Sequence, residues 1–476
     1  MSTLVNLPPL PENVVIRQLY LGCLSQASYL VGDATTGRAI AVDPRRDIDE
    51  MLTVAADAGL TIELIVETHF HADFLSGHLE LAEATGAEIG LGAAGTTEFP
   101  SRALADGEII DLGGVTVEVL ATPGHTPESV SLVVRPSAGA EPLAVLTGDA
   151  LFIGDVGRPD LLVSANIPAE EMGALLFKSV HRLMELPDDT MLLPAHGAGS
   201  ACGKSLSTDT VSTIGAQRLT NYAVQPMTEQ AFIDIVTEGQ VEPPAYFGTD
   251  AALNRMERPL FHEEVPTNVL DLEAFDAAVA DGAAILDTRS VETFALGHLR
   301  GSINICLTGR FAEQAGSLIA MDRPAVLVGD AAGVAEATLR LGRIGFDNVI
   351  GALLDPEGVI ATQPERADRL SRLTAAEFTT RRAELGDQLQ VIDVRNAGEV
   401  ADAPLDGTVN IPLTRLVDNL DTLDRNSPVA IVCAGGARSG IANSVLKGFG
   451  FTDVSDVLGG TSALGIDAAC TLGDPA

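Results

Sequence analysis

The chain contains 476 residues, 66 of them acidic and 29 basic, and carries a formal net charge of −37. At roughly 150 residues per domain, this length suggests about three domains. So acidic a chain is not expected to bind nucleic acid or an anionic membrane, because both partners require basic patches.

The first residues and the cysteines indicate the compartment. The N-terminal segment (MSTLVNLPPLPENVV) lacks a basic stretch followed by an apolar one, so no signal peptide is predicted. The sequence also lacks a run of roughly 18 apolar residues that could cross a membrane. Its five cysteines have no paired spacing; they are Cys23, Cys202, Cys306, Cys433 and Cys470. These features predict a cytoplasmic protein with free thiols.

Residues 1–245 are expected to form the first domain. Short apolar runs alternate there with helical patterns, and three of the runs, 62–66, 115–120 and 143–146, lead into loops that carry histidine or aspartate. Polar side chains at strand ends are typical of active sites, since a rigid strand fixes where the side chain lies. Residues 241–262 contain prolines without clear periodicity and are expected to be a linker.

The rest of the chain contains an internal repeat. The sequence at 284–289 (AILDTR) matches 390–395 (QVIDVR), and 301–305 (GSINI) matches 407–411 (GTVNI). Each copy alternates strand and helix patterns, which predicts an α/β domain with a parallel sheet. We expect these domains at 263–360 and 370–476.

Histidines and aspartates gather at the strand ends of the first domain. One loop carries His69, His71 and Asp73, and three later strand ends carry His125, Asp149 and His196. Four histidines with two aspartates in such positions favour a metal site over scattered structural residues.

The order and spacing of these residues resemble the metallo-β-lactamase superfamily. The resemblance implies an N-terminal αββα sandwich and a motif, HxHxDH, that usually helps to build two adjacent metal sites. Phe74 stands where the last histidine of the motif belongs, so the second site would keep Asp73, His196 and a shared Asp149. This handicaps a two-zinc hydrolase of the glyoxalase II kind, which needs both metals to polarise a carbonyl and generate hydroxide.

The remaining site resembles that of the persulfide dioxygenases of this superfamily. Two imidazoles and one carboxylate on one face of a metal are typical of non-haem iron(II) oxygenases. The resemblance implies that His69, His125 and Asp149 bind one Fe²⁺ per chain. His71, Asp73 and His196 would then surround these ligands and orient them.

Two further residues near the expected metal site have alternative interpretations. Arg158 either holds the anionic thiol substrate or forms a structural salt bridge. Cys202 is either a redox thiol or an inert buried side chain. It lies in the segment 194–204 (PAHGAGSACGK), which resembles the bacterial fusions of a persulfide dioxygenase with rhodanese domains.

The second repeat contains a cysteine loop, C-x-x-G-x-R-S, which resembles the active-site loop of rhodaneses. It is formed by Cys433, Gly436, Arg438 and Ser439 and follows a short apolar strand. We expect Cys433 and Arg438 to be catalytic and Gly436 and Ser439 to bind substrate, because inward-pointing N–H groups and an arginine stabilise an anionic persulfide.

The first repeat lacks the corresponding chemistry. In the sequence, Gly329 aligns with Cys433 and Val334 with Arg438. We therefore expect this copy to act as a scaffold for the active one.

The resemblance implies oxidation of a low-molecular-weight thiol persulfide, such as glutathione persulfide, with O₂ to sulfite and thiol. Rhodanese sulfur transfer among persulfide, sulfite and thiosulfate would accompany it. The alternatives are a zinc-dependent thioester hydrolase and a non-catalytic sulfur carrier. The sequence leaves open which thiol carries the persulfide and the oligomeric state, a homo-oligomer included.

Overall fold

The structure, a computed structural model, describes residues 2–161, 167–240 and 242–466. It divides into two compact units, one formed by residues 1–263 with 342–345 and the other by 264–341 with 346–476. Among the described residues, no helix combines the length and the apolar character needed to cross a membrane. Cys470 lies outside the described residues, and the other four cysteines are free thiols.

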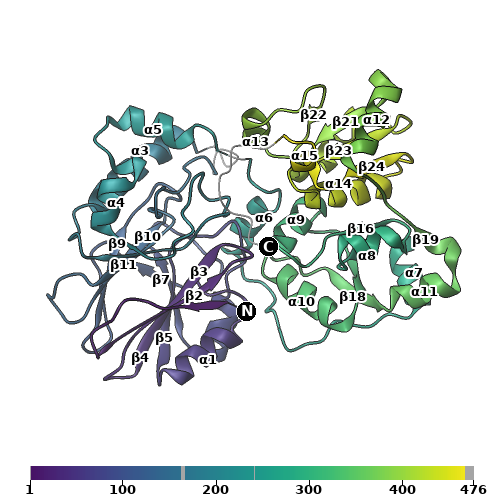
Figure 1. Cartoon of the computed structure of the whole chain (residues 1–476). Helices are drawn as coiled ribbons and strands as arrows, with labels where there is room; N and C mark the ends of the chain where they lie inside the picture. The colour runs from purple at the N-terminus through teal and green to yellow at the C-terminus, as the bar shows by residue number, and fades with distance from the viewer. Residues whose placement is uncertain (1, 162–166, 241, 467–476) are drawn as a thin grey trace. The chain divides into compact units, whose positions relative to one another are not determined.

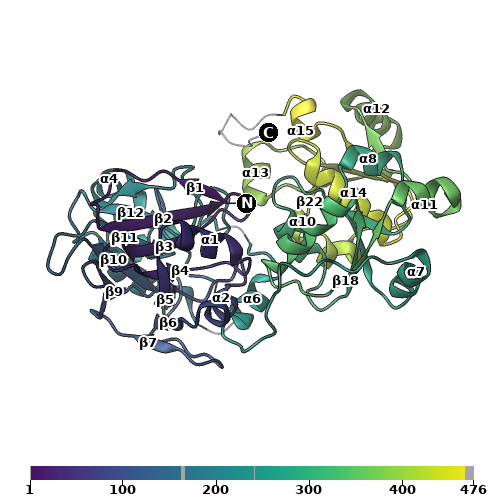
Figure 2. The same cartoon turned by 90° about the horizontal axis from the view of Figure 1, so that it is seen from below.

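The first unit is a sandwich of two β-sheets between helices. One sheet has seven strands in the order β1-β2-β3-β4-β5-β6-β7, and the other has six in the order β13-β12-β11-β10-β9-β8. Figure 1 shows α3 and α5 on one outer side and α1 on the other, and Figure 2 shows β1 to β7 side by side in chain order. The predicted αββα sandwich is confirmed.

The strands of this unit are β1 (Thr3–Val5), β2 (Val14–Leu21), β3 (Gln26–Asp33), β4 (Arg38–Val42), β5 (Thr61–Glu67), β6 (Glu88–Gly92), β7 (Arg102–Leu104), β8 (Ile109–Asp111), β9 (Thr116–Ala121), β10 (Val130–Arg135), β11 (Ala144–Gly148), β12 (Met191–Pro194) and β13 (Ser212–Thr213). Its helices are α1 (Asp49–Asp57), α2 (His78–Thr85), α3 (Ala169–Leu183), α4 (Ile214–Thr220), α5 (Glu229–Thr237) and α6 (Phe247–Leu253), with a 3₁₀ turn at Tyr222–Val224.

The apolar runs of the sequence become strands that are buried on both faces. Successive side chains of a strand point to opposite sides of the sheet. On β10, Leu132 and Val134 pack into the core between the two sheets, whereas Val133 packs against the helical layer that contains α3 and α5. A strand that supplies two cores must be apolar throughout, which explains why the sequence shows continuous apolar runs here.

The second unit contains two copies of a parallel α/β domain. The sheet order is β16-β14-β17-β18 in the first copy and β20-β24-β23-β21-β22 in the second, and the paired strands within each sheet are parallel. A parallel bridge between Val269 and Ala352 stands in the first copy where β20 pairs with β24 in the second. The predicted pair of α/β domains is confirmed.

The strands of this unit are β14 (Ala284–Asp287), β15 (His298–Leu299), β16 (Ser302–Asn304), β17 (Ala325–Gly329), β18 (Val349–Leu354), β19 (Ala367–Asp368), β20 (Ser371–Leu373), β21 (Gln390–Asp393), β22 (Val409–Asn410), β23 (Val429–Val432) and β24 (Val454–Val457). The helices are α7 (Leu272–Ala280), α8 (Val291–Leu296), α9 (Phe311–Leu318), α10 (Ala331–Gly342), α11 (Pro356–Thr362), α12 (Ala375–Leu385), α13 (Ala397–Asp402), α14 (Ala437–Gly448) and α15 (Gly460–Ala463). Short 3₁₀ turns lie at Pro364–Arg366, Gly386–Gln388, Leu413–Arg415 and Val417–Thr422.

Residues 241–262, expected to be a linker, are part of the first unit. The described part of this segment contains α6, and the first unit extends to residue 263 rather than 245. The buried Asn254 donates from Nδ2 to the carbonyls of His71 and Phe74, at 2.8 and 2.9 Å, and accepts from the N–H of Ser76 at 2.8 Å. One side chain therefore satisfies three backbone groups of the histidine-bearing loop, an arrangement that hydrophobic periodicity cannot reveal.

Asn254→Ala should lower the free energy of unfolding of the first unit by about 2–3 kcal/mol, because three buried backbone groups lose their partner. Urea denaturation of the full chain, followed by circular dichroism, measures the change. Glu257→Ala, at an exposed position of the same segment, is the control and should change stability by less than about 0.5 kcal/mol. Equal stability of the two variants would show that the loop does not depend on Asn254.

Candidate metal centre and cysteine loop

Three strand ends deliver His69, His125 and Asp149 to one place. His69 follows β5, His125 lies in the loop after β9, and Asp149 comes directly after β11. Both β9 and β11 run antiparallel to β10, so they point in the same direction and their C-termini lie at the same end of the sheet. Gly148 has a left-handed φ of +51°, and a Cβ there would come within 2.7 Å of the hydroxyl of Thr68, so the approach of β11 to this loop requires glycine.

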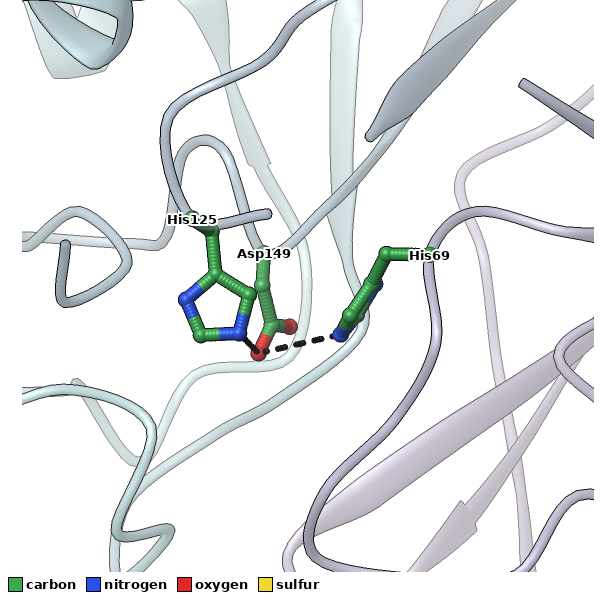
Figure 3. A group of neighbouring side chains, drawn as sticks. All are labelled: His69, His125 and Asp149. Atoms are coloured by element: carbon green, nitrogen blue, oxygen red, sulfur yellow. Dashed lines mark ion pairs between the residues drawn. The ribbon is translucent and has the colours of Figure 1, made fainter. Parts of the chain in front are cut away.

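The three side chains converge on one point. The Nε2 atoms of His69 and His125 lie 3.7 and 3.4 Å from the same oxygen of Asp149, Oδ2. Figure 3 shows the carboxylate of Asp149 between the two imidazole rings, with both ion pairs ending on that oxygen. All three residues are buried.

A hydrogen-bond chain fixes the proton of His69 away from this point. The Thr68 hydroxyl donates to Oδ2 of Asp43 at 2.8 Å and lies 3.0 Å from Nδ1 of His69. Because this hydroxyl gives its only proton to Asp43, it accepts from the Nδ1–H of His69. The lone pair of His69 Nε2 is therefore left facing Asp149.

The other two side chains are held in the same way. Nδ1 of His125 lies 3.0 Å from the carbonyl oxygen of Arg158, which can only accept, so Nδ1 carries the proton and Nε2 the lone pair. Oδ1 of Asp149 lies 2.7 Å from Nδ1 of His196, which leaves Oδ2 for the shared point. Each of the three thus has one atom in a hydrogen bond and another directed toward the same position.

The charge states suit a cation. Burial, reinforced by His71, holds the pKa of His69 well below its ordinary value, and burial also lowers the pKa of His125. Burial alone would raise the pKa of Asp149, but His196, which holds a proton against this carboxylate, outweighs burial and lowers that pKa. Neutral imidazoles and an ionised carboxylate are the forms that bind metal ions.

These residues fit a single divalent ion. An ion bound at about 2.1 Å holds neighbouring ligand atoms roughly 3.0–3.5 Å apart, close to the spacing found here. Within the described residues, His69 Nε2 and Asp149 Oδ2 are buried and have no hydrogen-bond partner, which a bound ion would supply.

The neighbouring position, where a second metal would lie, is built differently. Phe74 is fully buried, and its ring centroid lies 4.3 Å from that of His71. His196 is clamped between two carboxylates, with Nδ1 2.7 Å from Asp149 and Nε2 2.8 Å from Asp73. Burial opposes protonation of His196, but these carboxylates raise its pKa well above the ordinary value. Cys202 joins Asp73 and His196 in a second buried group of possible ligands.

His71 belongs to a third buried group, with Asp43 and Glu67. Its Nε2 lies 3.1 Å from Oδ1 of Asp43 and 3.6 Å from Oε2 of Glu67. Sequence reasoning overlooked Asp43, although an aspartate directly after the apolar run of β4 was a signal of the kind used for Asp149. It also overlooked Thr68, whose role becomes visible only when the strands are assembled.

Of the two interpretations of Arg158, substrate binding or a structural salt bridge, its contacts are those of a structural salt bridge. Its guanidinium forms two hydrogen bonds of 2.7 Å with Asp160 and donates to the carbonyl of Ala201 at 3.2 Å. Its backbone carbonyl is the group that orients His125. A role of the side chain in substrate binding stays a prediction.

In the second unit, the loop after β23 wraps around the sulfur of Cys433. The N–H groups of Gly436 and Ser439 donate to Sγ at 3.1 and 3.3 Å, and the hydroxyl of Ser439 lies 3.5 Å away. The φ of +95° at Gly436 places this residue in the region that favours glycine. Converging N–H groups of this kind stabilise a negative charge on sulfur.

Arg438, the other expected catalytic residue of the loop, is paired with Glu399 on α13. Its Nη1 and Nη2 donate to the two carboxylate oxygens at 2.7 and 2.6 Å. Burial alone would raise the pKa of Glu399, but the Arg438 guanidinium outweighs it and lowers that pKa. Glu399 is a further residue that the sequence reasoning overlooked, after Asp43 and Thr68.

The first copy cannot perform the same chemistry. The strand registers place Gly329 where Cys433 lies in the second copy, and the hydroxyl of Thr288 would be 2.4 Å from a Cβ at Gly329. The helix after β17 begins two residues after Gly329, whereas α14 begins four residues after Cys433. The alignment of Val334 with Arg438 was therefore wrong, because the two loops differ in length. The residue at the matching helix position is Ala332, so the first copy still lacks the arginine.

Comparison with known proteins agrees with this architecture. The sequence pattern of the metallo-β-lactamase superfamily matches residues 21–196, and that of the rhodanese-like domain matches 271–353 and 374–465. A crystal structure titled as a metallo-β-lactamase from Staphylococcus aureus is 36% identical, covers 72% of this chain and 99% of its own, and has a TM-score of 0.65. The sandwich and its strand-end site thus define a protein of the metallo-β-lactamase fold. The chain belongs to the metallo-β-lactamase superfamily and carries two rhodanese-like domains after that domain.

Curated relatives differ in the activities that their names state. The chain is 28% identical to the human protein named Persulfide dioxygenase ETHE1, mitochondrial, over 44% of this chain and 75% of that protein. It is 32% identical to a hydroxyacylglutathione hydrolase of Hyphomonas neptunium, over 39% of this chain and 67% of that protein. The chain spans about half the length of relatives named Beta-lactamase hydrolase-like protein from Xylella fastidiosa and Agrobacterium fabrum.

Thr68→Val should weaken binding of a divalent metal ion, with Fe²⁺ as the probe, by about tenfold or more, because the acceptor that fixes the proton of His69 on Nδ1 is lost. An anaerobic titration of Fe²⁺ against a competing chelator measures the affinity. Thr68→Ser keeps the hydroxyl and is the matched control, expected to bind like the unaltered protein. Unchanged affinity in the valine variant would rule out this role of Thr68.

Proposed function

We propose that the first domain is a persulfide dioxygenase and that the last domain is a sulfurtransferase. In the dioxygenase reaction, one thiol persulfide, one O₂ and one water give one thiol and one sulfite. Glutathione persulfide or an equivalent small thiol persulfide is the proposed substrate, and the cytoplasm is the proposed location. The proposed domains are 1–245, extended by the contacts of Asn254 to about 263, then 263–360 and 370–476.

The observation that carries the proposal is the single His–His–carboxylate group with Phe74 beside it. His69, His125 and Asp149 direct three ligand atoms to one position. At the neighbouring position, Phe74 packs against His71 and cannot bind a metal, and Asp73 forms an ion pair with His196. Two-metal hydrolysis needs both positions, whereas iron(II) oxygenases need one metal with open coordination sites.

The chain's own residues have distinct tasks in this proposal. Iron(II) held by the three ligands would supply a meeting point for O₂ and the terminal sulfur of the persulfide. His196 holds a proton on Nδ1 against Oδ1 of Asp149, so this carboxylate keeps one oxygen for the metal. Phe74 is buried and packs its ring against His71, so that side of His71 faces an apolar group that binds neither a metal nor a proton.

Sulfur transfer is proposed for Cys433. Its thiolate attacks the outer sulfur of a donor, the donor's S–S bond breaks, and the leaving thiolate or sulfite keeps the electron pair. The N–H groups of Gly436 and Ser439 would stabilise the persulfide anion that forms on Cys433. An acceptor thiolate or sulfite then removes the outer sulfur and regenerates the thiolate.

A zinc-dependent thioester hydrolase is the second candidate function. Asp73, His196 and Cys202 form a further buried group of possible ligands, which favours it, as does the similarity to a hydroxyacylglutathione hydrolase. The direct ion pair of His196 with Asp73 and the position of Phe74 weigh against a second metal.

Protein purified without oxygen should contain about one iron per chain and should consume O₂ when given glutathione persulfide, with sulfite as the product. Elemental analysis and an oxygen electrode measure both quantities. His69→Ala, His125→Ala and Asp149→Ala should each lose iron and oxygen uptake, because two remaining ligands hold Fe²⁺ weakly. Two zinc ions per chain together with thioesterase activity would sink the dioxygenase proposal.

Cys433→Ser should abolish sulfur transfer from thiosulfate and leave persulfide-dependent oxygen uptake unchanged, because serine is nearly isosteric but forms no stable persulfide. Thiocyanate production from thiosulfate and cyanide measures the transfer. Cys306→Ser is the matched control and should keep full activity. Full transfer in the Cys433 variant would place the transferring thiol elsewhere in the chain.

A further inference from the structure

The two rhodanese-like copies allow structural residues to be separated from chemical ones. Both copies contain an Asp–Arg pair at the end of the first central strand. The pairs are Asp287 with Arg289 and Asp393 with Arg395, each with an Nη2–Oδ2 distance of 2.6 Å. Because the first copy lacks a nucleophile but keeps this pair, the pair belongs to the fold rather than to sulfur transfer.

The pair of Glu399 with Arg438, unlike the Asp–Arg pair, occurs in only one of the two copies. Glu399 is the third residue of α13, and the third residue of the equivalent helix α8 is Thr293. The first copy thus lacks the equivalents of Cys433, Arg438 and Glu399 together. Within this chain, the Glu399 carboxylate is present only in the copy that has the sulfur-carrying cysteine.

The geometry of the pair indicates what the carboxylate does. The two terminal guanidinium nitrogens of Arg438, Nη1 and Nη2, donate to Glu399 at 2.7 and 2.6 Å, and the side chains of Arg438 and Glu399 are 27% and 36% exposed. Arg438 lies at the start of α14, where the helix dipole also favours anions. A carboxylate this close offsets the positive charge that would otherwise attract an anion to Cys433.

A capping role does not explain the charge of Glu399. Its Oε2 accepts from the N–H of Asn396 at 3.0 Å, as part of a capping box at the start of α13. The equivalent helix α8 is capped by Ser290, whose hydroxyl accepts from the N–H of Thr293 at 3.2 Å. A carboxylate is therefore unnecessary for the cap, and glutamine would keep the same hydrogen bond.

We propose that Glu399 is a specificity-determining residue that disfavours doubly charged sulfur donors at Cys433 by neutralising Arg438. The inference rests on the proposed sulfur transfer. Thiosulfate carries two negative charges, whereas an alkyl persulfide with an uncharged carrier carries at most one. In both cases Cys433 attacks the outer sulfur, the donor S–S bond breaks, and sulfite or a thiolate leaves with the electron pair. The loop therefore takes sulfur from persulfides with at most one negative charge in preference to thiosulfate.

Glu399→Gln tests the proposal, because it keeps the cap and removes the charge. The KM for thiosulfate should fall about two- to fivefold, the range expected for a partly exposed ion pair, with little change in kcat. The KM for the persulfide of 2-mercaptoethanol should change less, so the ratio of the two KM values shifts. Added salt should reduce the difference between variant and unaltered protein. The rate of thiocyanate formation with cyanide as acceptor gives both KM values and kcat.

Two further variants make the outcome decisive. Glu399→Thr introduces the residue that the first copy has at this helix position. It should shift the ratio of the two KM values in the same direction, and it replaces Glu399→Gln as the test if the glutamine variant folds poorly. Asp453→Asn removes one carboxylate from the Arg381 pair before β24, at the end of the parallel sheet opposite Cys433, and should leave the ratio unchanged. A higher KM for thiosulfate in Glu399→Gln would mean that Glu399 positions Arg438, and it would overturn the proposal. An equal shift in Asp453→Asn would do the same. Failure of the unaltered protein to transfer sulfur from either donor would instead overturn the proposed function.

Discussion

Asp149 brings a negative charge into the interior of the first unit, and the surrounding side chains make that charge tolerable. His196 takes one carboxylate oxygen, and the imidazoles of His69 and His125 face the other. An isolated buried carboxylate would tend to take up a proton, whereas this one is held ionised by the hydrogen bond and the charge of His196. The capacity to hold a cation thus follows from the way the buried charge is compensated.

The loops around the metal centre hold the two histidine ligands in position beside Asp149. Thr68 and Asp43 hold His69, and the carbonyl of Arg158 holds His125. These groups come from strand ends and loops far apart in the sequence, so the centre depends on correct assembly of both sheets. The apolar core between the sheets therefore positions the ligands as much as the loops do.

The strand-end histidines and aspartates and the duplicated α/β domains could be predicted because they leave local signals, whereas the αββα sandwich and the choice of His69, His125 and Asp149 came from the family resemblance. An apolar run followed by histidine or aspartate marks a strand end, and a repeated D-x-R followed by a similar N-I segment marks a duplicated domain. The contacts of Asn254 left no such signal, since an asparagine in a proline-containing stretch is typical of a linker. Glu399 was missed because its partner Arg438 lies 39 residues away. Val334 was wrongly aligned with Arg438 because the sequence alignment assumed loops of equal length. In the structure, the two helices begin at different distances after Gly329 and Cys433, so the loops differ in length.

The first rhodanese-like copy is separated from activity by several simultaneous changes. A cysteine at position 329 would collide with Thr288, the loop that should surround its sulfur is two residues shorter, and neither Ala332 nor Thr293 can replace the arginine and its carboxylate. No single substitution could restore function, and most intermediate sequences would gain nothing from their first change. No single point mutation can therefore turn this copy into a sulfurtransferase, although its apolar core and the Asp287–Arg289 pair are those of an intact domain.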